Sequence, residues 1–251
     1  MRHLDLFSGI GGFSLGLEKS GFKTVGFCEI EKYPRKVLKQ NWPDVKIYKD
    51  IRDVTGETLK ADGIIPEIIT GGFPCTDISH AGDQKGIDGE KSGLWSELHR
   101  VISEIQPNYA IMENVTNLIA GDRGRWFGRV LGDLAQIGFD AQWHCIQAAR
   151  LNALHRRDRI WIIAYPNGKG LERQREIASR ISTELNDFSY NCEWPVEPKL
   201  DRMAYGLPAR IHRIKGLGNA ILPRMAQLIG NVIKGIDDGN IRTEGPVSRQ
   251  G

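Results

Sequence analysis

The sequence predicts an α/β protein in which a parallel, doubly wound sheet carries helices on both faces. Short apolar, β-branched runs alternate with longer amphipathic runs as far as Tyr165. A chain of 251 residues with 40% hydrophobic content can bury a substantial core. A glycine-rich turn follows the first strand-like run, as expected where the backbone approaches a ligand at the start of a helix.

The expected elements follow one another with turn residues between them. Apolar β-branched runs predict strands at residues 3–7, 24–28, 45–48, 67–70, 109–113, 141–147 and 159–165. Amphipathic patterns predict helices at residues 12–20, 33–40, 94–105, 126–136 and 222–233. In such sheets ligands bind at the carboxyl ends of the strands, so functional residues are expected there.

The alternation of strands and helices stops after Tyr165. Residues 1–165 are expected to form the main domain, and residues 207–236 to return and complete it. Residues 166–206 are polar and show no clear period, which predicts a small second lobe. Residues 237–251 are expected to form a flexible tail.

Charge and cysteine usage limit the function classes. The net charge is only +3, but residues 150–215 hold 13 Lys and Arg against 8 Asp and Glu, which favours contact with a polyanion there. The four scattered cysteines form no Cys-x-x-Cys pair, which argues against a zinc or disulfide framework and indicates a reducing cytoplasm. No apolar run approaches membrane-spanning length, and the first residues leave no room for a signal peptide.

The segment DLFSGIGG, residues 5–12, is the first chemical signal. A strand ending near Asp5 enters a glycine-rich turn and a helix, but Ser14 stands where a dinucleotide fingerprint needs its third glycine. Glu29, at the end of the second strand, is placed to accept both hydroxyls of a ribose, and Asp50 to accept from an adenine amino group. Each acid taken alone is equally an ordinary loop residue.

The segment GGFPCTDIS, residues 71–79, places Cys75 at the carboxyl end of the fourth strand. A free cysteine is more often a small buried apolar residue than a nucleophile. Here Pro74 fixes the backbone before the thiol, and glycines punctuate the polar segment 79–92 as in a mobile lid. This context favours a nucleophile at the mouth of the nucleotide site.

Two further elements carry charge at strand ends. Glu113 ends the fifth strand in YAIMENV and is followed by Asn114, although a strand-end acid can simply point into water. Arg157 and Arg159 share one side of an extended segment and can both point at a phosphate or carbonyl oxygen. Alone, the arginines would be read as a solvated basic edge.

Together these motifs resemble the ordered motif set of the cytosine-5 DNA methyltransferases of bacterial or phage type. The resemblance rests on DLFSGIGG, GGFPCTDIS, MENV, the Arg157-x-Arg159 pair and GLGNAILP, and spans residues 3–165 and 206–230. It implies a doubly wound, Rossmann-like, S-adenosylmethionine-dependent methyltransferase fold, with catalysis in the main domain and target recognition in the small lobe. His155 departs from the family, which usually has Gln there, and the lobe of residues 166–206 is short.

The resemblance also implies the residues of the site. The catalytic residues would be Cys75, Glu113, Asn114, Arg157 and Arg159. The cofactor would lie against Asp5, Phe7, Gly9, Ile10, Gly12, Glu29, Ile30, Asp50, Ile51, Pro74, Leu94, Asn219 and Ile221, without a metal. A methyl group would pass from S-adenosylmethionine, leaving S-adenosylhomocysteine, to carbon 5 of a cytosine flipped out of a specific duplex DNA sequence, through a covalent adduct between Cys75 and carbon 6.

The implied partner is double-stranded DNA, with the chain acting as a monomer in the cytoplasm of a bacterium, or encoded by a phage. A cognate restriction endonuclease would accompany it in a restriction-modification system. A tRNA cytosine-5 methyltransferase stays open as an alternative, because its catalytic motifs are the same. A methyltransferase that acts on an exocyclic amino group typically carries a [DNS]-P-P-[YFW] motif at the corresponding strand end. That class is excluded because the chain contains no Pro-Pro pair. A non-enzymatic DNA-binding module ranks last, since the catalytic set is complete.

Overall fold

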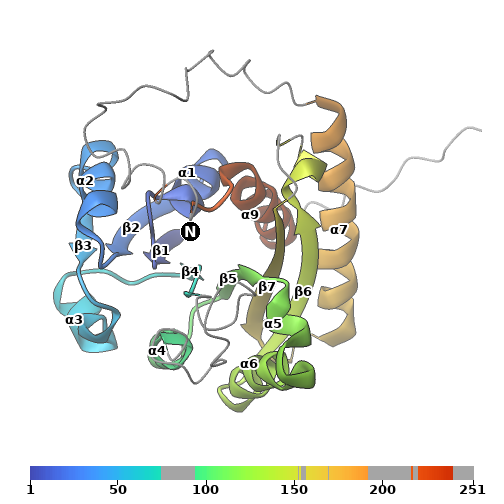
Figure 1. The fold of residues 1–251 in the computed structure, drawn as a ribbon, viewed down its shortest axis with the longest axis horizontal. Coiled ribbons are helices and arrows are strands. Elements are labelled where there is room, and N and C mark those ends of the chain that lie inside the picture. The colour runs from blue at the N-terminus through green and yellow to red at the C-terminus, as the bar shows by residue number, and fades with distance from the viewer. Residues whose placement is uncertain are drawn as a thin grey trace, which may run out of the picture.

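The structure, a computed structural model, describes residues 1–74, 94–151, 153, 157–168, 170–191, 216 and 220–239. Their centre is a seven-stranded sheet in the order β3-β2-β1-β4-β5-β7-β6 (Figure 1). The described strands are β1 (Arg2–Leu6), β2 (Lys23–Cys28), β3 (Lys46–Tyr48), β4 (Ile68–Gly71), β5 (Tyr109–Val115), β6 (Phe139–Gln147) and β7 (Asp158–Pro166). All seven predicted strands are confirmed, with ends that differ by one or two residues.

Helices cover both faces of this sheet, as the sequence predicts (Figure 1). One face carries α1 (Gly12–Lys19), α7 (Gly170–Asn191) and α9 (Pro223–Asp237). The other carries α3 (Gly56–Ala61), α4 (Leu94–Ile105), α5 (Asn117–Ala120) and α6 (Arg125–Gln136). Helix α2 (Lys32–Asn41) follows β2, and short turns of 3-10 helix lie at η1 (Ile51–Asp53), η2 (Gly121–Gly124) and η3 (Ala148–Leu151).

The residues of β5 show why the sheet is buried on both sides. Ala110 and Met112 pack into the core beneath α4 and α6, whereas Tyr109 and Ile111 pack into the core beneath α9. Because successive side chains of a strand point to opposite faces, a strand covered on both sides reads as a continuous apolar run. None of the described helices has the length and apolar character needed to cross a membrane.

One strand runs against the others, so the prediction of a parallel sheet is confirmed for six strands and wrong for β7. β7 pairs antiparallel with both β5 and β6, while the remaining pairs are parallel. The physical reason is the short connection between β6 and β7, which spans residues 148–157. A parallel return needs a crossover of a dozen or more residues, usually with a helix, and this connection is too short for one.

Residues 170–191 form α7, where the sequence shows a polar stretch without a clear period. Ile177 and Ile181 are buried and pack in the same core as Ile229 of α9. The interpretation of this stretch as aperiodic is therefore wrong, because a narrow apolar stripe between charged side chains is enough to dock the helix. The part of the predicted recognition lobe beyond Asn191 lies outside the described residues and stays a prediction.

Glycines let α1 and α9 approach closely. A Cβ atom at Gly12 would lie 2.4 Å from the carbonyl oxygen of Ile221, and one at Gly16 only 2.1 Å from that of Pro223. Both distances are shorter than any real Cβ contact, so these positions admit no larger residue without separating the helices. The close approach holds the segment before α9 against the first turn of α1.

Candidate active site

The carboxyl ends of β1, β2 and β3 are joined by backbone hydrogen bonds. The N–H of Ser8, after β1, donates to the carbonyl oxygen of Cys28 at 3.0 Å. The N–H of Glu29, after β2, donates to the carbonyl oxygen of Tyr48 at 3.0 Å. The turn after β1 and the residues that follow β2 and β3 therefore form one continuous edge of the sheet.

Glu29 is fixed at this edge beside the glycine-rich turn. Its Oε2 accepts from the N–H of Gly9 at 2.8 Å, and its Oε1 accepts from the N–H of Glu31 at 2.7 Å. Burial raises the pKa of Glu29, and the two backbone donors oppose that shift. Gly9 has φ +53° and open space where a Cβ would stand, and the neighbouring Ile30 is 69% exposed. The Glu29 carboxylate, the backbone of Gly9 and the exposed side chain of Ile30 thus lie at one place. This combination of acceptors, backbone and apolar surface fits a nucleoside.

Asp5 lies beneath the turn and does not reach its surface. The side chain is fully buried; its Oδ2 accepts from the hydroxyl of Ser14 at 2.8 Å and its Oδ1 from the hydroxyl of Thr70 at 3.1 Å. The Thr70 oxygen is in turn 2.7 Å from Nε2 of His3. Burial raises the pKa of Asp5 to about 7 and lowers that of His3 to about 3. The Asp5 side chain is therefore enclosed in this structure, where it joins α1 to β4.

The turn after β3 carries Asp50 and Ile51. Oδ1 of Asp50 accepts from the N–H of Arg52 at 3.0 Å, which begins η1. Ile51 is buried, with 4% of the residue exposed. The carbonyl oxygens of Ile51 and Val54 accept hydrogen bonds from Arg100 of α4. Sequence reasoning missed Arg100, because its spacing to Glu97 and Glu104 is that of an ordinary helix-surface ion pair.

The turn after β4 leads to Cys75, which itself lies outside the described residues. Nδ2 of Asn114 donates to the carbonyl oxygen of Phe73 at 3.3 Å, and Oδ1 of Asn114 accepts from the N–H of Val115 at 2.8 Å. Asn114 is 1% exposed, so it holds the turn from behind. A Cβ at Gly72 would lie 3.5 Å from Oε2 of Glu113, which places this turn against the Glu113 carboxyl.

Glu113 pairs with Arg159 at the end of β5. Nε of Arg159 is 2.8 Å from Oε1 of Glu113. Burial raises the pKa of Glu113, and the charges of Arg159 and Arg157 oppose that rise. A narrow cavity is lined by Glu113, Arg157 and Arg159 together with Trp161 and side chains of η3 and α9. Sequence reasoning missed Trp161, which reads as part of an apolar strand.

The reversed direction of β7 creates this pairing. Val115, the last residue of β5, lies opposite Arg159, the second residue of β7. In a parallel arrangement the start of β7 would lie at the other end of the sheet, about 25 Å away for nine residues. The antiparallel direction of β7 therefore brings both arginines to the end of β5, where Glu113 lies.

The remaining predicted residues lie around the same edge or outside the described part. Ile221 is 9% exposed, and its Cδ1 is 3.3 Å from where a Cβ of Gly72 would stand. Leu94 begins α4 and packs against the core, and Gly12 is buried at the start of α1. Partly exposed positions on the strand-end turns are Phe7, Ile10 and Pro74, whereas Asn219 and His155 lie outside the described residues.

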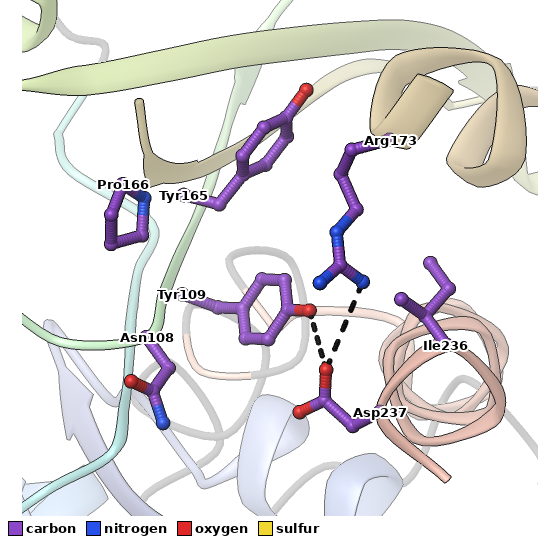
Figure 2. Close-up of a pocket in the computed structure, with 7 residues that line it drawn as sticks. All are labelled: Asn108, Tyr109, Tyr165, Pro166, Arg173, Ile236 and Asp237. Atoms are coloured by element: carbon purple, nitrogen blue, oxygen red, sulfur yellow. Dashed lines mark hydrogen bonds and ion pairs between the residues drawn. The ribbon is translucent and has the colours of Figure 1, made fainter. Parts of the chain in front are cut away.

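A larger pocket of about 450 Å³ lies at the opposite end of the sheet (Figure 2). It contains none of the predicted site residues. The hydroxyl of Tyr109 donates to Oδ1 of Asp237 at 2.8 Å, and NH1 of Arg173 lies 3.9 Å from the same oxygen. Burial and Asp237 raise the pKa of Tyr109 to about 12. These groups pair with one another and tie α7 and α9 to β5. Among the described residues, no cluster of His, Cys, Asp or Glu side chains has a composition that could hold a metal ion.

The strand order, the single antiparallel strand and the helices on both faces define a doubly wound α/β fold of the Rossmann-like type. A solved variant of DNMT2 from Spodoptera frugiperda shares the fold, with a TM-score of 0.55 at 20% identity, covering 67% of this chain and 51% of that chain.

Sequence comparison identifies the family. The family model for C-5 cytosine-specific DNA methylases matches residues 1–193, and the chain belongs to that family. The Type II methyltransferase M2.BsuMI of Bacillus subtilis is 34% identical over 168 residues, covering 65% of this chain and 42% of that protein. The Type II methylase M.HgiEI of Herpetosiphon aurantiacus is 31% identical over 231 residues, covering 90% of this chain and 51% of that protein. The chain thus spans about half the length of these relatives.

Proposed function

We propose that this chain transfers a methyl group from S-adenosylmethionine to carbon 5 of cytosine in duplex DNA. The observation that carries the proposal is the buried, arginine-paired Glu113 carboxyl, held against the turn that leads to Cys75. Family membership and the Type II methyltransferase relatives support the same reaction.

The cofactor site fits the residues at the ends of β1, β2 and β3. Glu29 would accept from the ribose hydroxyls, Ile30 would pack on the adenine and Asp50 would accept from its amino group, beside the backbone of Gly9. S-adenosylmethionine supplies an electrophilic methyl group when it is bound there. Glu29 and Asp50 are also suited to a cofactor that carries positive charge.

The chain's own residues would make cytosine reactive. The thiolate of Cys75 forms a bond to carbon 6, and the ring electrons move toward N3, where the carboxyl proton of Glu113 neutralises them. Arg157 and Arg159 hold the O2 side of the base or a neighbouring phosphate. Carbon 5 would then take the methyl group as its bond to the cofactor sulfur breaks, and the N3 proton would return to Glu113. A base would then remove the carbon 5 proton, the bond between Cys75 and carbon 6 would break, and the thiolate would leave.

Replacing Cys75 by Ala is expected to lower DNA methylation to background while DNA binding persists, because the sulfur supplies the bond to carbon 6. Incorporation of tritium from methyl-labelled S-adenosylmethionine measures the loss. In the wild type, a duplex with 5-fluorocytosine at the target is expected to trap a covalent adduct that withstands denaturing gels. Cys145→Ala, which removes an exposed thiol on β6, is the matched control. Normal turnover by Cys75→Ala would refute the assignment of the nucleophile.

Binding of duplex DNA is expected to weaken as salt rises, because Lys and Arg contacts to phosphates release counterions. The logarithm of the association constant should fall linearly with that of the salt concentration, by about 0.9 per phosphate contacted. Fluorescence anisotropy of a labelled duplex at several salt concentrations measures this slope, and a flat response would contradict a polyanionic partner.

Offering tRNA and duplex DNA to the enzyme with labelled cofactor separates the two substrate classes, since only one should take up the label.

A further inference from the structure

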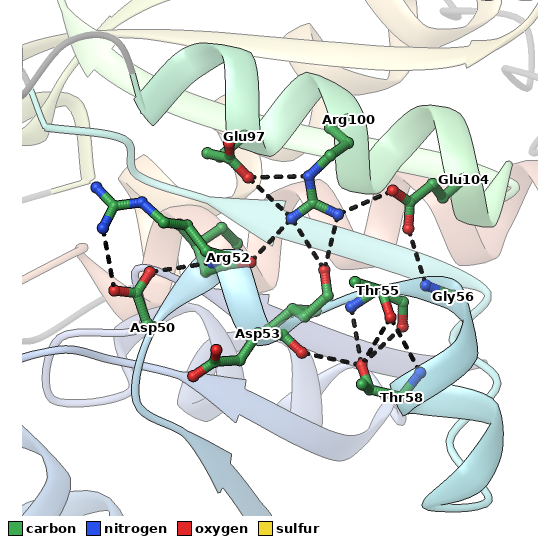
Figure 3. Close-up of polar contacts among 11 residues, drawn as sticks. Asp50, Arg52, Asp53, Thr55, Gly56, Thr58, Glu97, Arg100 and Glu104 are labelled. Atoms are coloured by element: carbon green, nitrogen blue, oxygen red, sulfur yellow. Dashed lines mark hydrogen bonds and ion pairs between the residues drawn. The ribbon is translucent and has the colours of Figure 1, made fainter.

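Arg100 of α4 makes contacts that reach well beyond an intrahelical ion pair (Figure 3). Its Nε and NH2 lie 2.9 Å from Oε2 of Glu97, and its NH1 donates to Oε1 of Glu104 at 2.9 Å. The remaining donors point across to the turn after β3. NH2 donates to the carbonyl oxygen of Ile51 at 3.0 Å, and NH1 and NH2 both donate to that of Val54 at 3.1 Å.

The two glutamates fix the guanidinium so that its free edge faces the turn. A guanidinium is a planar fork of five donors, and the two carboxylates on its own helix set its orientation. Oε2 of Glu104 also accepts from the N–H of Gly56 at 2.9 Å. Helix α4 therefore holds the turn at three backbone points, namely the carbonyls of Ile51 and Val54 and the N–H of Gly56.

The contact with Ile51 reaches the Asp50 carboxylate through one rigid unit. The carbonyl of Ile51 and the N–H of Arg52 belong to the same planar peptide group. Arg100 holds the carbonyl side of that group, and its N–H side donates to Oδ1 of Asp50 at 3.0 Å. A rotation of this peptide plane would break both hydrogen bonds at once. The orientation of the Asp50 carboxylate thus depends on Arg100 through its Oδ1, while its Oδ2 lies 3.5 Å from NH1 of Arg52.

We infer that Arg100 is a positioning residue for cofactor binding, which acts on Asp50 through the peptide group between Ile51 and Arg52. The inference rests on the proposed use of S-adenosylmethionine, with Asp50 accepting from the adenine amino group. Without Arg100 the turn samples other orientations of this peptide, and only the fraction with Asp50 correctly oriented binds the cofactor. The chemical step at Glu113 lies at the end of a different strand and does not depend on this turn.

Calorimetric titration with S-adenosylhomocysteine tests the inference on the full chain. Arg100→Ala is expected to raise the Kd about tenfold, with kcat at saturating S-adenosylmethionine changed less than about twofold. Arg100→Lys keeps the charge but cannot bridge two carbonyls and two carboxylates, so it should fall between the wild type and Arg100→Ala. Arg180→Ala is the matched control, because Arg180 is similarly buried on α7 and pairs with Glu176 far from the turn.

A double-mutant cycle with Asp50→Ala shows whether Arg100 acts through Asp50 or its loss simply disturbs the structure. If Arg100 acts through Asp50, its removal should change the Kd less than about twofold once Asp50 is already Ala. Additive effects of the two substitutions would overturn the route, and an unchanged Kd in folded Arg100→Ala would overturn the positioning role. Failure of the wild type itself to bind S-adenosylhomocysteine would instead refute the proposed function, so the two failures are distinguishable.

Discussion

Glu113→Gln is expected to lower kcat by about 10² to 10⁴-fold, the usual contribution of a positioned acid or base. Glutamine keeps the shape and can donate a hydrogen bond, but it has no carboxyl proton to give to N3 of cytosine. The Kd for S-adenosylhomocysteine should not change, because Glu113 lies at the end of β5 and the cofactor edge is formed by β1, β2 and β3. Single-turnover methylation of a target duplex measures the chemical step directly.

The pH dependence provides a second measurement of the same group. Burial raises the pKa of Glu113, so the protonated form persists to higher pH than for an exposed glutamate. The step that needs this proton is therefore expected to slow as pH rises through the raised pKa, and Glu113→Gln should lose that limb of the profile. Glu176→Gln on α7, which removes another arginine-paired carboxylate, is the control. A kcat for Glu113→Gln within tenfold of wild type would contradict the acid role.

Gly16→Ala is expected to lower the free energy of unfolding by about 3 kcal/mol, at the upper end of the usual cost of overpacking. The added Cβ would lie 2.1 Å from the carbonyl oxygen of Pro223 and 2.9 Å from the N–H nitrogen of Gln227. Neither atom belongs to a flexible side chain, so α1 and α9 must separate. Denaturant unfolding followed by circular dichroism measures the change, and the melting temperature should fall by roughly 10 °C.

The matched control is Gly128→Ala in the middle of α6. A Cβ at Gly128 would meet no atom within 4 Å, so this substitution gains helix propensity without a clash. It is expected to stabilise the protein by about 0.5–1 kcal/mol. Equal melting temperatures for the two alanine variants would show that α1 and α9 tolerate separation, contrary to the packing described here.

The strands were predictable because burial on both faces leaves a continuous apolar, β-branched run. The short elements α3 and η1 were missed, since three to six residues are too few to show a period. α7 was missed because its apolar stripe is narrow. The predicted direction of β7 was wrong because periodicity carries no information about the direction of a strand. The length of the connection before the strand determines that direction.

The candidate site was predictable as a set of strand ends but not as a set of contacts. The order of the parallel strands places Glu29 and Asp50 at one edge, and it places Glu113 on the strand next to the one that precedes Cys75. The ion pair between Glu113 and Arg159 joins residues that are distant in sequence, and it depends on β5 and β7 being neighbours in the sheet. Asp5 shows the opposite case, because a strand-end acid is read as exposed until Ser14 and Thr70 are seen to enclose it.

The packing of α7 and α9 has a consequence for how the C-terminal part of the described chain is held to the sheet. Both helices are embedded in the same apolar core, where Ile177 and Ile181 of α7 lie with Ile229 of α9. A substitution that loosens one of these helices should therefore weaken the anchoring of the other, although α7 and α9 are separate elements of the chain.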